Sequence, residues 1–203
     1  MMKQTLIDSN SSLNGWNRQL INENLSQNNG RLIISGVLQR AGAKNQNGRV
    51  YPRPILERES KKYKDTFIKE GNALGELDHP ETAVVELKNA SHRILDIWWE
   101  GDDLCGKLEV LHRTPAGGIV KGLLEHGVTI GISSRGLGSV KNIDENTVEV
   151  MEDFDLICWD LVSNPSTQRA FMEVIKEGVD KQHSMISPEM RINSIINDII
   201  SLE

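Results

Sequence analysis

The sequence is poor in the residues on which several classes of protein depend. Its 203 residues include two cysteines, and aromatic residues make up 4%. Cys105 and Cys158 stand in apolar or alternating contexts, so we expect buried free thiols in a reducing compartment rather than a disulfide. Neither belongs to a Cys-x-x-Cys pair of the kind that binds zinc. A disulfide framework and a cysteine-ligated metal domain are therefore excluded.

Long apolar runs and clusters of basic residues are also missing. No run approaches the roughly 18 apolar residues that a transmembrane helix needs, and the N-terminus lacks the apolar core of a signal peptide. The net charge is −6 and the isoelectric point is near 5.5. Binding to nucleic acid needs a clustered excess of Lys and Arg. We therefore expect an intracellular protein that binds neither membranes nor nucleic acid.

The patterns that are present predict an α+β fold around an antiparallel sheet or a small barrel. Alternating or β-branched runs indicate strands at residues 31–40, 91–100, 104–111, 147–151 and 153–162. Proline or serine opens helical patterns at residues 52–68, 115–125, 166–178 and 188–203. We expect a loosely ordered leader over 1–30, one main domain over 31–178, and a linker with a helical tail over 179–203.

One stretch holds two adjacent serines between glycines, Gly131-Ile132-Ser133-Ser134-Arg135-Gly136. Glycine lets another chain approach the backbone closely, so Ser133 and Ser134 could be presented to a ligand. The same residues also fit a β-turn whose serines bond to the backbone. The stretch alone leaves both interpretations open.

Two other residues have the chemistry to work with a serine. His79 follows a glycine-containing loop and precedes Pro80, a place suited to a general base. Asp160 lies in an otherwise apolar strand, so it must be hydrogen-bonded or must orient a histidine. A metal site is the alternative, with the candidate ligands Glu76, Asp78, His79 and His92, but their spacing fits no known metal motif.

The combination of motifs resembles the prohead core protein proteases of T-even-like tailed bacteriophages. The residues that carry the resemblance are Asn47-Gly48-Arg49-Val50-Tyr51-Pro52, Ala73-Leu74-Gly75-Glu76-Leu77-Asp78-His79-Pro80, Asp96-Ile97-Trp98-Trp99, Gly131 to Ser139 and the Asp160 strand. The resemblance implies a serine endopeptidase that needs no cofactor or metal. It also implies a fold similar to that of herpesvirus maturational proteases, a small antiparallel β-barrel surrounded by helices.

The resemblance assigns roles to individual residues. His79 is the general base, Ser133 the nucleophile and Asp160 the third member of a triad. By analogy with the herpesvirus group, the amides that stabilise the oxyanion are expected between Asn164 and Arg169. Ser134, Arg135 and Gly136 are rival candidates for that role.

The family also implies substrates and a place of action. The expected substrates are scaffold and capsid proteins inside an assembling prohead in the host cytoplasm, cleaved after Glu in Leu/Ile-x-Glu sequences. This pattern occurs within the chain at Ile21-Asn22-Glu23 and Ile175-Lys176-Glu177, among other places, so self-processing is a hypothesis. The alternative is a non-catalytic scaffold or assembly component that retains the fold. The sequence leaves the oligomeric state open, a homo-oligomer included.

Overall fold

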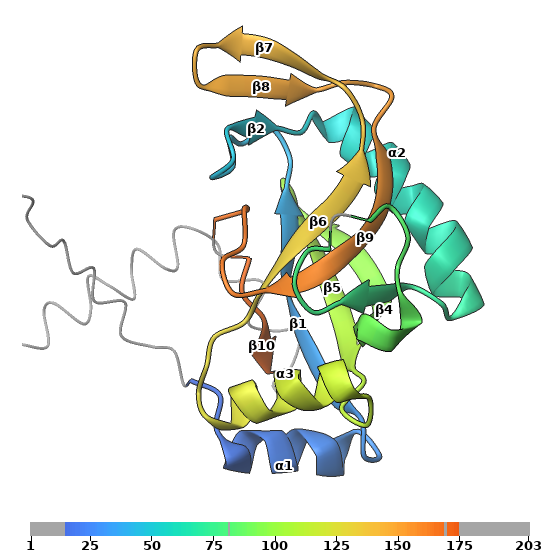
Figure 1. The fold of residues 1–203 in the computed structure, drawn as a ribbon, viewed down its shortest axis with the longest axis vertical. Coiled ribbons are helices and arrows are strands. Elements are labelled where there is room, and N and C mark those ends of the chain that lie inside the picture. The colour runs from blue at the N-terminus through green and yellow to red at the C-terminus, as the bar shows by residue number, and fades with distance from the viewer. Residues whose placement is uncertain (1–14, 81, 169, 175–203) are drawn as a thin grey trace, which may run out of the picture.

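The protein combines three helices with ten strands among the residues that its computed structural model describes, 15–80, 82–168 and 170–174 (Figure 1). The helices are α1 (Arg18–Gln27), α2 (Arg53–Tyr63), which continues as a π-helical turn (Lys64–Ile68), and α3 (Pro115–Glu125); a 3-10 turn spans Leu87–Asn89. The strands are β1 (Leu32–Arg40), β2 (Arg49–Val50), β3 (Leu74–Glu76), β4 (Ala90–Glu100), β5 (Asp103–Val110), β6 (Gly131–Leu137), β7 (Val140–Asp144), β8 (Thr147–Val150), β9 (Asp155–Val162) and β10 (Glu173–Val174). The predicted α+β class is confirmed. Within these residues no helix has the length and apolar character needed to cross a membrane.

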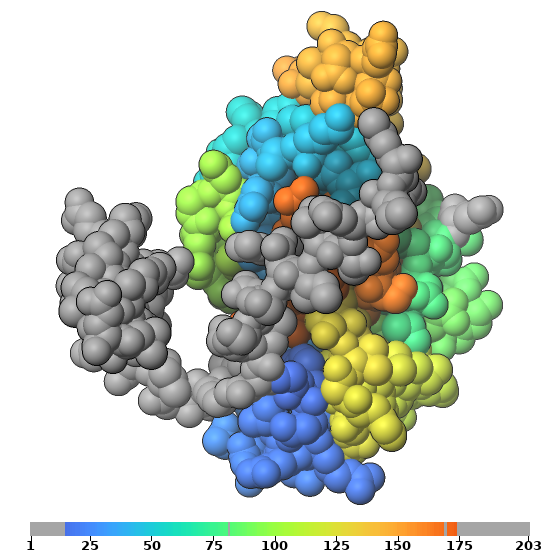
Figure 2. Space-filling model, turned by 90° about the vertical axis from the view of Figure 1, so that its left-hand side faces the viewer, coloured from blue at the N-terminus to red at the C-terminus, as the bar shows by residue number. Residues whose placement is uncertain are grey.

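The strands pair into three sheets. The largest is antiparallel and has the order β10-β1-β5-β4-β3. Strands β6 and β9 form a separate antiparallel ribbon, and β2, β8 and β7 form a third sheet. The β7–β8 hairpin projects from one end of the molecule (Figures 1 and 2). The ribbon crosses the large sheet and contributes Ile132, Leu156, Trp159 and Leu161 to the hydrophobic core.

The closed barrel expected from the sequence is not formed by the described strands, so that part of the prediction is wrong. The large sheet and the β6–β9 ribbon meet at two seams. Leu77 bridges Leu161 at one seam, and Gly131 bridges Phe171 at the other. Isolated bridges replace continuous ladders because β3 has three residues and β10 has two, too few to pair along the ribbon. A likeness to the herpesvirus proteases stays a prediction.

Local sequence explains where two of the helices begin and end. Pro52 precedes α2, and Pro115 occupies the first turn of α3, where its missing N–H costs nothing. The Thr114 hydroxyl accepts a hydrogen bond from the Gly117 amide at 3.1 Å and caps α3. Gly127 follows α3 with φ of 77°, a left-handed conformation that ends the helix. Both helices lie where the sequence predicts them.

Strand β4 changes its buried side halfway along. His92 and Ile94 are buried, and so is Ile97, which simple alternation would place on the opposite face. A β-bulge between Ile94 and Asp96 adds one residue and shifts the alternation. Simple alternation would place His92, Ile94, Asp96 and Trp98 on one face of the predicted strand, and this holds only before the bulge.

Helix α1 packs onto the body, whereas the sequence assigned residues 1–30 to a loosely ordered leader. Ile21 is completely buried. The Asn24 amide donates to the Ile33 carbonyl and its oxygen accepts from the Ile33 amide, both at 2.8 Å. The predicted start of the main domain at residue 31 therefore leaves out a helix that packs on it. Polar Asn24 is buried and hydrogen-bonds to β1, whereas its sequence context indicates a solvated residue. The predicted tail, residues 179–203, lies outside the described residues.

After β9 the chain forms bends and a turn over residues 163–168 and is extended over 170–174, although a helix was predicted over 166–178. Ala170 and Met172 are buried whereas Phe171 between them is 38% exposed, an alternation typical of a strand. Residues 173–174 then pair with β1. The helical prediction is therefore wrong for the described part of this segment, because β1 offers an edge that an extended chain can satisfy.

The two ends of the described chain meet at one corner. Trp16 is buried, and its indole N–H donates to the Met172 carbonyl at 3.0 Å. The Met172 amide donates in turn to the Ile130 carbonyl at 3.0 Å, immediately before β6. The first described residues, the last ones and the start of β6 are thus joined by hydrogen bonds.

Candidate active site

The glycine-flanked serines lie in strand β6 and not in a turn. In the antiparallel register of β6 and β9, Ser133 lies opposite Asp160 and Arg135 opposite Cys158. Directly opposed residues, and residues two apart on one strand, point to the same face. Strand pairing therefore brings a serine, an arginine and an acid to one side of the ribbon.

His79 reaches this side from the loop after β3. Asp78 adopts φ of 65°, a left-handed conformation that Asp tolerates, and its amide donates to the Leu161 carbonyl at 2.8 Å. This turn places His79 Nδ1 at 2.8 Å from Asp160 Oδ2. Because a carboxylate only accepts, His79 donates its Nδ1–H, and Nε2 of the neutral imidazole is left free to accept a proton.

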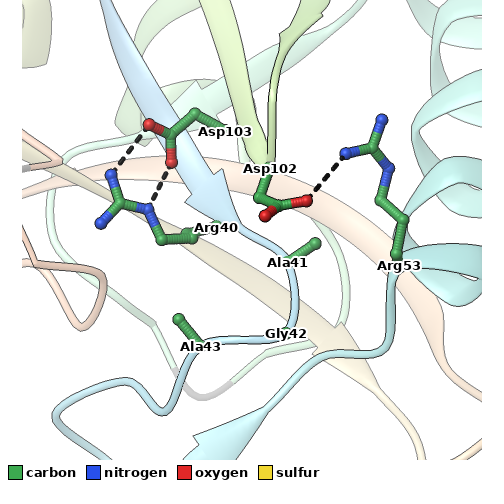
Figure 3. A pocket seen from close by; sticks show the side chains of 7 residues that line it. All are labelled: Arg40, Ala41, Gly42, Ala43, Arg53, Asp102 and Asp103. Atoms are coloured by element: carbon green, nitrogen blue, oxygen red, sulfur yellow. Dashed lines mark hydrogen bonds and ion pairs between the residues drawn. The ribbon is translucent and has the colours of Figure 1, made fainter. Parts of the chain in front are cut away.

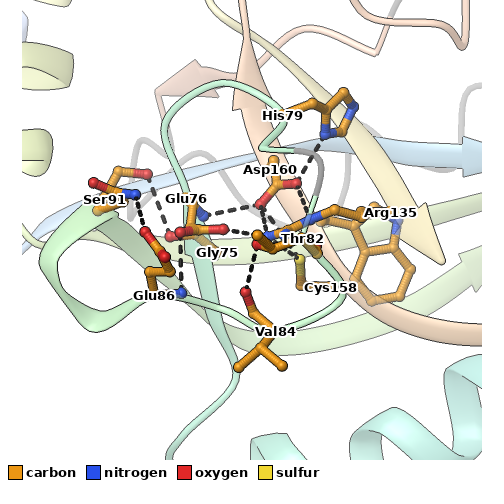
Figure 4. A network of polar contacts seen from close by, with 12 residues as sticks. Gly75, Glu76, His79, Thr82, Val84, Glu86, Ser91, Arg135, Cys158 and Asp160 are labelled. Carbon is orange, nitrogen blue, oxygen red and sulfur yellow. Dashed lines mark hydrogen bonds and ion pairs between the residues drawn. The ribbon is translucent and has the colours of Figure 1, made fainter.

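Asp160 is fully buried, and every contact of its carboxylate is with a donor (Figure 4). Oδ2 accepts from His79 and from Arg135 Nε, each at 2.8 Å. Oδ1 accepts from the Glu76 amide at 3.0 Å, from Arg135 Nη2 at 3.2 Å and from the Cys158 thiol at 3.3 Å. Burial alone would raise the pKa of Asp160, but the hydrogen bonds from His79, Glu76 and Arg135 outweigh it and hold the pKa below its ordinary value. The acid is thus kept ionised beside the histidine.

Ser133 is 5% exposed and lines a cleft of about 220 Å³ together with His79. Its Oγ lies 3.0 Å from Ser166 Oγ. The loop that carries Ser166 can approach because Gly131 has no side chain; a Cβ there would lie 2.6 Å from the Pro165 ring. The structure therefore joins His79 and Asp160 directly and places Ser133 in the same cleft, with its hydroxyl on Ser166.

Ser134 and Gly136, two of the predicted oxyanion candidates, line this cleft, and so does Arg135. The Ile132 amide donates to the Ala170 carbonyl, away from β9. Main-chain groups alternate along a strand, so those of Ser134 also face away from β9. In the described part of the chain they have no hydrogen-bond partner, which leaves the Ser134 amide available to a ligand.

The other three oxyanion candidates are Arg135, Asn164 and Arg169, and none of them presents a free donor to the cleft among the described residues. The Arg135 guanidinium contacts Asp160, the Glu76 carboxylate and, at 2.6 Å, the Thr82 carbonyl. These contacts occupy its donors, so it is not available to an oxyanion. Asn164 is exposed and does not line the cleft, and Arg169 lies outside the described residues. Sequence reasoning missed the use of Arg135, although its place two residues after Ser133 puts both on one strand face.

The metal site considered from the sequence conflicts with the contacts of its proposed ligands. His92 donates from Nε2 to the Trp159 carbonyl at 3.1 Å, and its Nδ1 accepts from the Ser91 hydroxyl at 2.9 Å. The two Glu76 oxygens accept from Arg135 and from the Glu86 amide. These ligand atoms are committed to hydrogen bonds, and nowhere among the described residues do three His, Cys, Asp or Glu side chains converge on a metal position.

His92 should make stability depend on pH. Burial lowers its pKa to about 4, against only partial compensation from the charge of Asp160. Between pH 6.5 and 4 the unfolded chain binds a proton that the folded chain cannot, so the free energy of unfolding should fall by about 3 kcal/mol as pH decreases. Denaturant titrations at several pH values measure this slope. His92→Gln should flatten it, whereas His126→Gln, a change at an exposed histidine, should not; equal slopes in all three proteins would contradict the assignment.

A second cleft, of about 540 Å³, lies beside the β4–β5 turn (Figure 3). Its charged side chains are already paired: Arg40 contacts Asp103 at 2.5 and 2.8 Å, and Arg53 contacts Asp102 at 3.4 Å. Its lining residues include no serine or histidine. Catalytic chemistry therefore points to the smaller cleft at Ser133.

The comparisons with known proteins agree with the resemblance seen in the motifs. Residues 16–181 match the family described as prohead core protein serine protease. The chain is 36% identical over 143 residues to the prohead core protein protease of Enterobacteria phage T4, covering 70% of this chain and 68% of that protein. Its structure is similar to that of the bacteriophage T4 capsid assembly protease, with a TM-score of 0.63 and 35% identity over 66% of this chain and 84% of that one. This chain therefore belongs to the family of prohead core protein serine proteases.

Proposed function

We propose that this chain is a serine endopeptidase that cleaves scaffold and capsid proteins inside an assembling phage prohead in the host cytoplasm. The observation that carries the proposal is the hydrogen bond of 2.8 Å between His79 and Asp160, beside a cleft that Ser133 also lines. Membership of the prohead protease family and the likeness to the T4 capsid assembly protease support the place of action.

The mechanism follows from the protonation states in the site. His79 Nε2 takes the proton of Ser133 Oγ as that oxygen attacks the peptide carbonyl, and it then gives the proton to the leaving amine. Water repeats the cycle on the acyl-enzyme and releases the acid product. Asp160 holds the imidazole in the required tautomer and stabilises its positive charge while it carries the proton.

The oxyanion needs donors in this cleft. Each such donor is worth about 3–4 kcal/mol of barrier lowering where it has been measured. The Ser134 amide is the candidate that the geometry favours, since it faces away from β9 on the strand that carries Ser133. The loop that begins at Asn164 remains the candidate by analogy with the herpesvirus group.

Cleavage after Glu has a physical rationale in Arg49. This exposed side chain lines the cleft, and its guanidinium has no hydrogen-bond or ion-pair partner within the described chain. A guanidinium beside the nucleophile favours an acidic substrate side chain. Of the internal matches named above, Ile21-Asn22-Glu23 lies in α1 with Ile21 buried, so cutting there would first require α1 to open. Residues 175–177 lie outside the described residues.

A non-catalytic assembly component is the second candidate. One observation favours it: the Ser133 hydroxyl contacts Ser166, and no hydrogen bond joins it to His79 among the described contacts. Catalytic hydrogen bonds are often long or misaligned before substrate binds, so this contact also fits an enzyme at rest.

Fluorophosphonate labelling separates the two candidates. We expect peptide mapping to place the adduct on Ser133, because the probe needs a serine activated by a base. The unlabelled chain incubated with its Ser133→Ala copy should yield new termini after Glu, and prior labelling, but not chelation, should prevent this. An unmodified Ser133 in assembled particles, with an unrelated serine hydrolase labelled alongside, would favour the assembly component.

A further inference from the structure

Three charged side chains lie in series behind His79 (Figure 4). Asp160 contacts Arg135, and Arg135 contacts Glu76 in turn. Asp160 and Glu76 are completely buried and the Arg135 side chain is 9% exposed, so solvent screens these charges little. The mechanism proposed above uses Asp160 and gives no task to Glu76.

The contacts of Glu76 define its charge state. One oxygen contacts Arg135 Nη2, and the other accepts from the Glu86 amide at 3.0 Å. Both partners can only donate, so the acceptor-only carboxylate is the form that fits. The three side chains then carry −1, +1 and −1.

Arg135 by itself would work against the base. Its Nε lies 2.8 Å from Asp160 Oδ2, the same oxygen that binds His79. A guanidinium there competes for the carboxylate charge and repels the imidazolium that forms during catalysis. A second carboxylate on the far side of the guanidinium offsets this effect and restores a net negative charge behind the histidine.

We propose that Glu76 is a positioning residue, which pairs with Arg135 and so leaves the negative charge of Asp160 available to His79. This inference rests on the proposed serine mechanism and extends it by one residue. Glu76 touches neither substrate nor the reacting atoms; it acts through Arg135.

The backbone brings Glu76 to this place by close packing. Strand β3 can lie against β9 because residue 75 is glycine: a Cβ there would lie 2.1 Å from the Trp159 carbonyl oxygen and 2.4 Å from the His92 ring. A bulge between Gly75 and Glu76 then aims the carboxylate at Arg135. The same approach lets the Glu76 amide reach Asp160.

Other titratable or charged groups surround the network. They come from every neighbouring element: Asp78 and Glu86 in the β3–β4 loop, Arg49 in β2, Tyr63 in α2, His92 in β4 and Cys158 in β9. Burial raises the pKa of Tyr63 and of Cys158, and it lowers that of His92, so all three are neutral near pH 7. They therefore add no charge to the series at that pH.

The test measures the pH midpoint of His79 protonation by NMR. It uses the full chain with Ser133→Ala, which prevents self-cleavage. Glu76→Gln should lower the midpoint of the His79 titration by about half to one pH unit, because one negative charge is lost. Arg135→Gln should move the midpoint to higher pH, because Asp160 no longer shares its charge. Opposite shifts cannot arise from a common loss of stability. If Glu76→Gln fails to fold, the double variant Glu76→Gln/Arg135→Gln tests the same role. Its midpoint should return from the Arg135→Gln value toward that of the parent, and equal midpoints in the single and double variants would overturn the proposal.

Activity supplies a second readout in the chain that retains Ser133. With Glu76→Gln the acid limb of the kcat/KM profile should move to lower pH by the same amount, and kcat should fall about three- to ten-fold with KM unchanged. Glu86→Gln is the matched control: its carboxylate is 39% exposed and contacts Lys88, so neither readout should move. Equal His79 midpoints in the Glu76→Gln protein and its parent would overturn the positioning role of Glu76 and leave the serine mechanism intact. Failure of the fluorophosphonate probe to label Ser133 would overturn the serine mechanism.

Discussion

Ser133→Ala is expected to reduce proteolysis by roughly a million-fold, since residues that act as one catalytic unit fail together when the nucleophile is removed. The hydroxyl occupies the one strand position that lies opposite Asp160 and in the cleft with His79. Alanine fits that position without strain, so the folded state should be unchanged apart from the loss of the contact with Ser166. Cleavage of a scaffold-derived peptide, followed by chromatography, measures the change.

Ser134→Ala is the matched control, because it makes the same substitution at the next residue of β6. The Ser134 side chain points to the opposite face from Ser133, and its proposed contribution comes from the backbone amide, which the variant keeps. Activity should therefore stay within about ten-fold of the parent. Similar losses in the two variants would contradict the assignment of Ser133 as nucleophile.

Asp160→Asn is expected to lower kcat on the order of ten-thousand-fold, the second-largest effect. All contacts of this carboxylate come from donors, so the new NH₂ group must face one of them. If it faces His79, the imidazole turns to the tautomer that carries its proton on Nε2, and it can no longer accept from Ser133. Steady-state kinetics should show the loss in kcat rather than in KM.

The variant should also be less stable, because Asp160 is buried beside Arg135. Breaking one side of a buried ion pair costs about 3–5 kcal/mol, although Glu76 still offers Arg135 a partner. Asp155→Asn tests the same substitution in β9 at an exposed side chain paired with Lys62, and it should preserve both activity and stability. Asp160→Asn activity within ten-fold of the parent would exclude the triad.

Much of the fold could be predicted because several elements carry a strong local pattern. Strands β1, β4, β5, β8 and β9 and helices α2 and α3 lie within a few residues of their predicted ranges. The pattern fails where pairing partners decide the outcome. Residues 170–174 are apolar enough for a helix, yet the open edge of β1 makes them extended. Helix α1 was assigned to a loosely ordered leader because the residue that binds it to β1 is Asn24, and a polar side chain is normally expected to be exposed to solvent.

The candidate site was proposed from the sequence as a set of residues, whereas the contacts among those residues could not be predicted. His79, Ser133 and Asp160 stand out by loop chemistry, flanking glycines and an acid in an apolar strand. Their roles remain proposals, although the pairing of His79 with Asp160 supports them. The link from Arg135 to Glu76 depends on strand register and on a bulge, and neither can be read from one sequence.

The meeting of Trp16 with Met172 has a consequence for anything attached to the chain. Since these residues are hydrogen-bonded, residues 15 and 174, where the described chain begins and ends, lie at the same corner of the body. A fusion partner, an affinity tag or a tether joined directly at residue 15 or at residue 174 would thus be anchored at this one corner. Grafting residues 15–174 between two linked domains would require little separation of their attachment sites.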